Sequence, residues 1–171
     1  MKKSFIDTFL FFSDCPDNKL KNVSVGKSEA MPFSKGALIW SDKKYALTYI
    51  PVYLRVGFFI KQCHKGINKG ENISITVTGS VKVFVAIEEE NERSGGYEKS
   101  LPDNGWKREL ETIKANYLKE DISLTRIFSK SENKEPKILL PPTTTGETTM
   151  LIIVVSTCQG KTFIMYRSQL C

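Results

Sequence analysis

The residues best suited to binding chemistry gather around the second of the two tryptophans in the chain. Trp106 and Tyr97 carry aromatic rings, and Asp103, Asn104 and Arg108 lie within a few positions of them. Aromatic faces stack on sugar rings, and neighbouring polar groups can hydrogen-bond the hydroxyls of a ligand. Two interpretations follow: these five residues form a ligand-binding site, or Trp106 packs into the protein interior with its ring N–H satisfied locally.

A run of glutamates raises the question of a bound cation. Glu88, Glu89 and Glu90 are consecutive, and Glu92 follows. Calcium takes several oxygen ligands, but consecutive side chains of an extended segment point in alternating directions and rarely converge. Glu88 and Glu90 are therefore weak metal candidates, and we expect a solvated acidic loop with no bound metal or cofactor.

The sequence offers little for catalysis. His64 is the only histidine, and no nucleophile, metalloprotease or phosphate-loop motif occurs. Cys63 precedes His64, but side chains at adjacent strand positions diverge. A carboxylate pair such as Glu88 and Glu98 would suit glycoside hydrolysis and stays open as an alternative. We expect no catalytic residues and a protein that is not an enzyme.

Composition limits the class of partner. The chain has 171 residues and a net charge of +6, with 13 Lys or Arg against 6 Asp or Glu in residues 1–85. No basic run exceeds two residues, so a nucleic-acid footprint is not indicated. The longest apolar run is far below the ~20 residues of a membrane helix. Residues 1–20 lack a small-residue cleavage site, so we expect no signal peptide and a cytoplasmic location.

Cysteines and asparagines give two further expectations. Cys15, Cys63, Cys158 and Cys171 are widely spaced and form no CxxC pair, so free thiols are expected rather than a disulfide scaffold. Two Asn-x-Ser patterns, at residues 22–24 and 72–74, would matter only in a secreted protein.

Period-two alternation dominates the middle of the chain. The runs 73–77 and 81–87 are rich in β-branched residues, flank a short break with Gly79, and predict an antiparallel hairpin. Further strands are expected at 38–40, 45–50, 56–60, 122–128, 137–140, 150–156 and 163–166. Residues 88–105 predict a long polar loop, and the spacing of Leu110, Ile113 and Tyr117 predicts a short helix.

Together these elements predict an all-β fold. We expect an antiparallel β-sandwich or jelly roll of about eight or nine strands, with at most one or two short helices. Residues 1–36 are predicted to form an N-terminal arm that packs on the body. Residues 37–171 are predicted to form a single sandwich domain.

The order of the apolar blocks along the chain resembles the order found in a known class of β-sandwich module. The blocks are KYALTYIPVYLRVGFFIK, ISITVTGSVKVFVAIEE, LPDNGW, ISLTRIFSK, ILLPP and TTMLIIVVS. Over roughly residues 38–156 this order resembles a β-sandwich module of the galactose-binding-domain-like class, found beside carbohydrate-active enzymes and in larger surface proteins. The resemblance implies recognition of a glycan, and folds of this class often carry a structural calcium.

Three functions remain open. The first is a non-catalytic recognition module that binds a glycan or a protein through loops at one end of the sandwich. The second is an intracellular scaffold subunit that docks through a sheet face or the N-terminal arm. The third is a small glycoside-acting hydrolase.

Overall fold

The computed structural model describes most of the central part of the chain. It covers residues 8–9, 23–24, 29–61, 63–64, 69–70, 73–77, 81–88, 96–132, 137–145 and 149–156. The predictions for Cys15, Cys158, Cys171, Glu90, the two Asn-x-Ser asparagines and the strand at 163–166 lie outside these residues. So does most of the N-terminal arm.

The described residues form thirteen strands, one α-helix and one 3-10 turn. The strands are β1 (Thr8–Phe9), β2 (Val23–Ser24), β3 (Glu29–Pro32), β4 (Ala46–Tyr49), β5 (Phe58–Lys61), β6 (Ile73–Val77), β7 (Val81–Ile87), β8 (Lys107–Glu109), β9 (Ile113–Tyr117), β10 (Glu120–Leu124), β11 (Arg126–Glu132), β12 (Lys137–Leu140) and β13 (Met150–Ser156). The 3-10 turn is η1 (Val52–Leu54) and the helix is α1 (Tyr97–Asp103).

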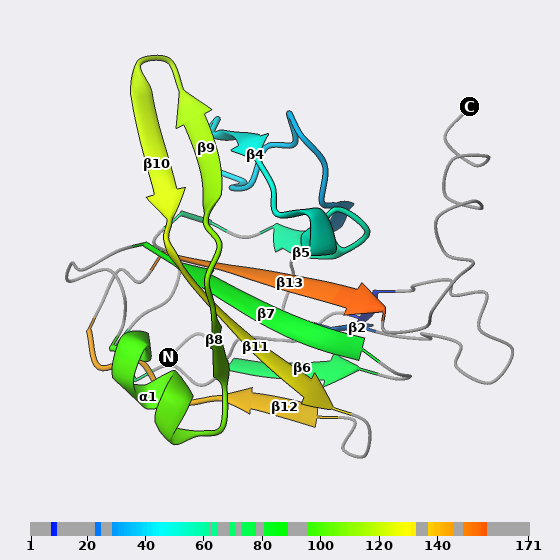
Figure 1. Cartoon of the computed structure of the whole chain (residues 1–171), viewed down its shortest axis with the longest axis vertical. Helices are drawn as coiled ribbons and strands as arrows, with labels where there is room; N and C mark the ends of the chain where they lie inside the picture. The colour runs from blue at the N-terminus through cyan, green and yellow to red at the C-terminus, as the bar shows by residue number, and fades with distance from the viewer. Residues whose placement is uncertain are drawn as a thin grey trace, which may run out of the picture.

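All strand pairings are antiparallel, and they build three sheets (Figure 1). A six-stranded sheet has the order β3-β5-β13-β7-β11-β8, a four-stranded sheet the order β1-β2-β6-β12, and a three-stranded sheet the order β10-β9-β4. The all-β sandwich predicted from the sequence is therefore confirmed. The strands outnumber the eight or nine expected because several are only two to four residues long.

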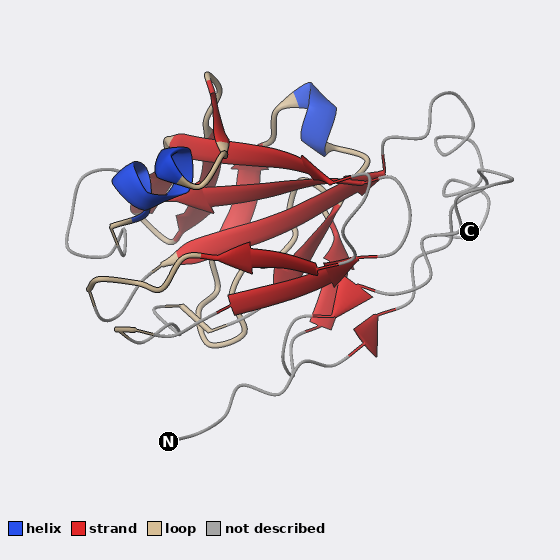
Figure 2. Cartoon of the chain, turned by 90° about the horizontal axis from the view of Figure 1, so that it is seen from below, coloured by secondary structure: helices blue, strands red, loops and turns tan. Residues whose placement is uncertain are grey.

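The six-stranded sheet buries apolar side chains on both faces. In β7, Val83 and Val85 belong to a first core that the four-stranded sheet and α1 also line, whereas Phe84 and Ala86 belong to a second core beneath the three-stranded sheet. Because successive side chains of a strand point to opposite faces, one strand can serve two cores. Figure 2 shows the two main layers of strands stacked face to face.

Three local expectations were wrong. The strands at 73–77 and 81–87 exist, but β6 pairs with β2 and β12 while β7 pairs with β11 and β13. Strands β6 and β7 face each other across the first core, because Ile75 of β6 and the odd-numbered residues of β7 are buried there. Alternating side chains fix a strand but leave its partner undetermined.

The helix expected near Leu110 is instead strand β8, a bend and strand β9. Leu110 is 99% exposed, whereas Ile113 and Ala115 are buried and alternate with exposed Lys114. The hairpin between β9 and β10 turns at Leu118, whose φ of 56° is left-handed. The one α-helix of the described residues lies within the stretch expected to be loop, where Tyr97 and Leu101 share a buried face at helical spacing.

Candidate functional site

Polar side chains replace apolar ones where the three-stranded sheet stops covering the six-stranded sheet. The register places Ser129 of β11 opposite Phe84 of β7, and places Ile127 opposite Glu109 of β8. Directly paired residues share a face, so Glu109, Ser129 and Lys82 lie on the face of the second core. Figure 1 shows the β9–β10 hairpin at one end of this face and no described element in front of the lower part of β7 and β11.

Six residues define what we call the sheet-face patch. They are Tyr49, Tyr53, Lys82, Glu109, Glu111 and Ser129. They come from β4, η1, β7, β8, the bend after β8, and β11, so segments distant in the sequence meet here.

Glu109 is the centre of the hydrogen bonding in the patch. Ser129 Oγ donates to Glu109 Oε1 at 2.6 Å, and Lys82 Nζ donates to the same oxygen at 2.9 Å. The Lys82 and Glu109 side chains are 32% and 19% exposed, so the pair is half-buried and still reached by solvent. Hydrogen bonds to an ionised group are shorter and stronger than neutral ones, so this arrangement fixes the carboxylate in place.

The same contacts keep Glu109 ionised. Burial alone would raise the pKa of this carboxyl, but the hydrogen bonds from Ser129 and Lys82 and the charges of Lys82 and Lys107 outweigh it. The pKa of Glu109 is consequently lowered below its ordinary value of 4.5. At neutral pH the patch therefore presents a carboxylate, which accepts hydrogen bonds and does not donate them.

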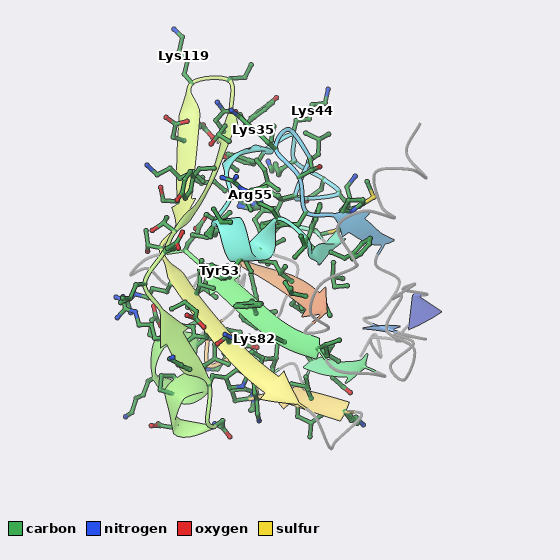
Figure 3. The ribbon with its side chains drawn as sticks, turned by 45° about the vertical axis from the view of Figure 1, so that its right-hand side comes forward. Lys35, Lys44, Tyr53, Arg55, Lys82 and Lys119 are labelled. Carbon is green, nitrogen blue, oxygen red and sulfur yellow. The ribbon has the colours of Figure 1, made fainter. Side chains whose placement is uncertain are left out.

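Aromatic rings border the ion pair. The Tyr53 ring packs on Phe84 with centroids 5.5 Å apart, and Lys82 Nζ lies 4.9 Å from the Phe84 centroid. Figure 3 shows the Tyr53 side chain reaching from η1 over the sheet towards the part of β7 that carries Lys82. Tyr49 is 45% exposed, and its hydroxyl donates to Glu111 Oε2 at 3.4 Å.

Tyr53 keeps its proton over almost the whole pH range. Burial, followed by the negative charges of Glu109 and Glu111, raises the pKa of Tyr53 to about 12. Its hydroxyl is shielded from solvent and has no hydrogen-bond partner among the described residues. A shielded O–H group without an acceptor costs free energy in the unliganded protein.

A second polar cluster surrounds His64, and the side chains of His64 and Glu88 at its centre are largely shielded from solvent. The His64 ring lies between Trp40 and Tyr45, at centroid distances of 5.4 Å and 5.9 Å. Its Nε2 is 4.0 Å from Glu88 Oε1, and the side chains of His64 and Glu88 are only 8% and 10% exposed. The backbone N–H of His64 donates to Asp42 Oδ1 at 2.6 Å. This cluster ties the chain around His64 to the second core, to which Trp40 and Tyr45 belong.

The residues singled out around Trp106 do not share one surface. Trp106 and Tyr97 are 4% and 0% exposed and belong to the first core, so neither ring offers a free face to a ligand. Asp103, Asn104 and Arg108 are exposed. Asn104 Nδ2 donates to the carbonyl of Ser100, so this side chain stabilises the end of α1.

Of the glutamates considered for a metal or for hydrolysis, Glu88 and Glu98 lie among the described residues, and each faces a basic side chain. Glu88 faces His64, and Glu98 Oε1 lies 3.7 Å from an Arg126 guanidinium nitrogen. Within the described residues, no group of three or more His, Cys, Asp or Glu side chains is placed to hold a metal ion. The helix within those residues is too short to cross a membrane.

Sequence reasoning missed the sheet-face patch, although one signal was present. Lys82 interrupts the apolar run VKVFVAI, in which all six of the remaining residues are buried. A lysine inside a strand that is buried on both faces needs a partner. That partner, Glu109, is 27 positions away and cannot be identified without the strand pairing.

Comparisons with known proteins give a likeness of fold. No protein-family model matches the chain, and a search of curated proteins found no match. Two solved structures are similar. One is a β-glucuronidase from glycoside hydrolase family 2, with a TM-score of 0.54, 10% identity, and coverage of 78% of this chain and 14% of that chain.

The other is a glycoside hydrolase family 138 enzyme that targets pectin rhamnogalacturonan II. It matches with a TM-score of 0.55 and 14% identity, over 90% of this chain and 18% of that chain. This chain thus spans less than a fifth of either enzyme, and identities this low speak for the fold alone. The chain therefore has the fold of a small β-sandwich portion of glycoside hydrolases.

Proposed function

We propose that the chain is a non-catalytic carbohydrate-recognition module that binds its ligand on the sheet-face patch. The observation that carries this proposal is the half-buried Lys82–Glu109–Ser129 network with exposed Tyr49 beside it. Sugar sites combine a few fixed polar groups with an aromatic surface, and this patch has both. The binding surface is thus a sheet face rather than the loops around Trp106.

Two further observations support a carbohydrate ligand. The fold is that of a portion of two carbohydrate-active enzymes. The order of the apolar blocks also resembles a galactose-binding-domain-like module. Neither observation identifies a sugar, and the chemistry of the patch carries the proposal further than the fold does.

The non-catalytic part of the proposal rests on the groups in the patch. A general base or acid works best with a pKa near the operating pH, but the pKa of Glu109 is lowered and that of Tyr53 is raised to about 12. The single histidine is buried in the other cluster, against Glu88. Glu109 and Tyr53 are therefore suited to holding a ligand and poorly suited to transferring protons.

A glycan array compared across two lysine variants tests this function. Lys82→Met keeps the apolar stem of the side chain but removes the charge and the hydrogen bond to Glu109. Lys137→Met is the matched control, because Lys137 is an exposed lysine next to buried Ile138 on β12, in the four-stranded sheet rather than the sheet that carries the patch. We expect Lys82→Met to lose at least about tenfold in affinity, as for a charge-assisted hydrogen bond, and Lys137→Met to bind like the unmodified protein.

Three outcomes would contradict the proposal. The first is that no glycan binds, and the second is that Lys82→Met binds as tightly as the control. The third is hydrolysis of a bound glycoside that Glu109→Gln abolishes, which would show an enzyme. A stoichiometric protein partner that co-purifies with both variants would instead support the scaffold interpretation.

A further inference from the structure

We propose that the sheet-face patch recognises a vicinal diol of an uncharged sugar, held between Glu109 and Lys82. This inference rests on the proposed carbohydrate-binding function and names the chemical class of its ligand. Three properties of the patch carry it: balanced charge, unused hydrogen-bonding capacity on adjacent groups, and an exposed aromatic edge.

The charges in and next to the patch are balanced, which favours an uncharged ligand. The patch itself holds Lys82, Glu109 and Glu111, and neighbouring Lys107 of β8 adds the second positive charge; each of the four acts on Glu109 or on Tyr53. An anionic sugar would meet the two carboxylates, and a cationic one would meet the two lysines. Figure 3 shows Lys44 and Lys119 at the opposite end of the molecule, so they add nothing to the charge here.

Hydrogen-bonding capacity remains on both members of the ion pair. Ser129 and Lys82 donate to the same oxygen of Glu109, Oε1, and no described residue donates to Oε2. The Lys82 ammonium has three N–H groups, of which the bond to Glu109 uses one. The patch therefore offers an acceptor and a donor side by side, on groups that are already fixed by each other.

A vicinal diol matches this pair of groups. One hydroxyl can donate to Glu109 Oε2 while its neighbour accepts from Lys82 Nζ, and neither bond requires the ion pair to break. Both bonds are charge-assisted, so they are stronger than those between neutral groups. The exposed ring of Tyr49 can then contact the apolar C–H surface of the same sugar.

The Glu109→Gln variant gives effects of opposite sign for uncharged and anionic ligands. The amide keeps the shape of the side chain but removes the negative charge, and with its oxygen towards Lys82 and Ser129 it offers the diol an N–H donor in place of the acceptor Oε2. It also leaves Lys82 without its counter-charge, so an anion is attracted more strongly. We expect Glu109→Gln to lose at least about tenfold in affinity for neutral polysaccharides, such as dextran and galactomannan, and to bind heparin more tightly than the unmodified protein.

A change in the ligand tests the diol without altering the protein. Periodate cleaves the carbon–carbon bond of vicinal diols, and borohydride reduction then leaves an uncharged polymer. We expect the unmodified protein to lose binding to a polysaccharide treated in this way, and to bind the untreated polymer equally at low and high salt. This experiment still tests the diol if Glu109→Gln does not fold, and Lys137→Met serves again as the protein control.

The outcomes separate this inference from the proposed function. Tight, salt-sensitive binding of heparin by the unmodified protein, with no binding of the neutral polysaccharides, would overturn the diol while leaving carbohydrate recognition intact. Unchanged binding of the periodate-treated polymer would do the same. Failure of the unmodified protein to bind any glycan would overturn the carbohydrate function and the diol with it.

Discussion

Glu109 is the residue on which the charges of the sheet-face patch converge. It receives hydrogen bonds from Ser129 and Lys82, so its ionised form is favoured in the folded protein. Replacing one partner of such a pair leaves the other without compensation, which makes the network sensitive to single substitutions. Its proton affinity is therefore a measurable property of the fold as well as of the site.

Acid titration of Glu109 gives the first prediction. Because the pKa of Glu109 is lowered in the folded state, its contribution to the free energy of unfolding is present above pH 4.5 and is lost as the pH falls through the folded-state pKa. Lys82→Met removes a hydrogen bond and a positive charge, so the folded-state pKa of Glu109 should rise and the loss of stability in acid should become smaller. Carbon-13 shifts of the carboxyl groups, with urea unfolding at each pH, measure both effects. If the free energy of unfolding falls identically with decreasing pH in the unmodified protein and in Lys82→Met, then Lys82 does not set the pKa of Glu109.

Tyr53→Phe gives the second prediction, at the same scale. The Tyr53 hydroxyl is shielded and unpartnered among the described residues, so removing it should leave the free energy of unfolding unchanged or raise it by up to about 1 kcal/mol. The raised pKa of Tyr53 adds stability below pH 10 that is lost as the pH rises from 10 to about 12. Tyr53→Phe should lack this alkaline loss.

Absorbance of tyrosinate checks the second prediction directly. The step that Tyr53 contributes near pH 12 in the unmodified protein should vanish in Tyr53→Phe. Tyr49→Phe is the matched control, since Tyr49 is exposed on the same patch. If the step near pH 12 disappears in Tyr49→Phe instead, it belongs to Tyr49, and the prediction for Tyr53 is wrong.

Among the elements, the connection between η1 and β5 contains Gly57, which allows this connection to lie close to β13. A Cβ at Gly57 would lie 2.8 Å from Val155 Cγ2 and 2.9 Å from the carbonyl oxygen of Val154. The second contact is with backbone of β13, which cannot move without disturbing the six-stranded sheet. Glycine is therefore required here for space.

Gly57→Ala gives the third prediction. We expect the free energy of unfolding to fall by about 1–3 kcal/mol, as for other cases of overpacking in a core. Gly36→Asn is the control, because Gly36 has φ of 87°, which asparagine tolerates, and a Cβ added there would meet no atom within 4 Å. Urea unfolding followed by circular dichroism measures both, and equal stability of the two variants would contradict the close approach.

A comparison of the predicted and observed elements shows how much of the fold the sequence could predict. Alternation in 81–87 correctly predicts a strand, because every residue there except Lys82 is buried in one core or the other. The same alternation cannot name a partner strand, so the expected hairpin was wrong. Apolar residues between Leu110 and Leu118 fit helical and strand spacing almost equally well, and the exposure of both leucines shows which spacing was accidental.

The candidate site was harder to predict than the fold for a related reason. Trp106 attracts attention in the sequence because large aromatics can bind ligands, yet its size also makes it valuable in the core, where it lies. Ser129 and Lys82 are 20 and 27 positions from Glu109. Only the order β7-β11-β8 brings them together, and that order depends on long-range pairing that residue types do not specify.

For the molecule as a whole, the six-stranded sheet contributes side chains to both cores, and this sharing determines how the protein should unfold. Residues of β7 and β13 alternate between the first and second cores, so separating the three-stranded sheet would expose one face of the strands that the first core needs. We therefore expect the two cores to unfold as one cooperative unit.

The two tryptophans test this fourth prediction because each lies in a different core. Trp40 is 1% exposed in the second core, and Trp106 is 4% exposed in the first. In Trp40→Phe, fluorescence reports the first core alone, and in Trp106→Phe it reports the second. Within each variant, the urea transitions seen by fluorescence and by far-ultraviolet circular dichroism should coincide. A fluorescence transition in Trp106→Phe that precedes the loss of strand signal would show that the three-stranded layer opens independently. The face of β7 and β11 that carries the sheet-face patch would then be larger in that open state than in the folded one.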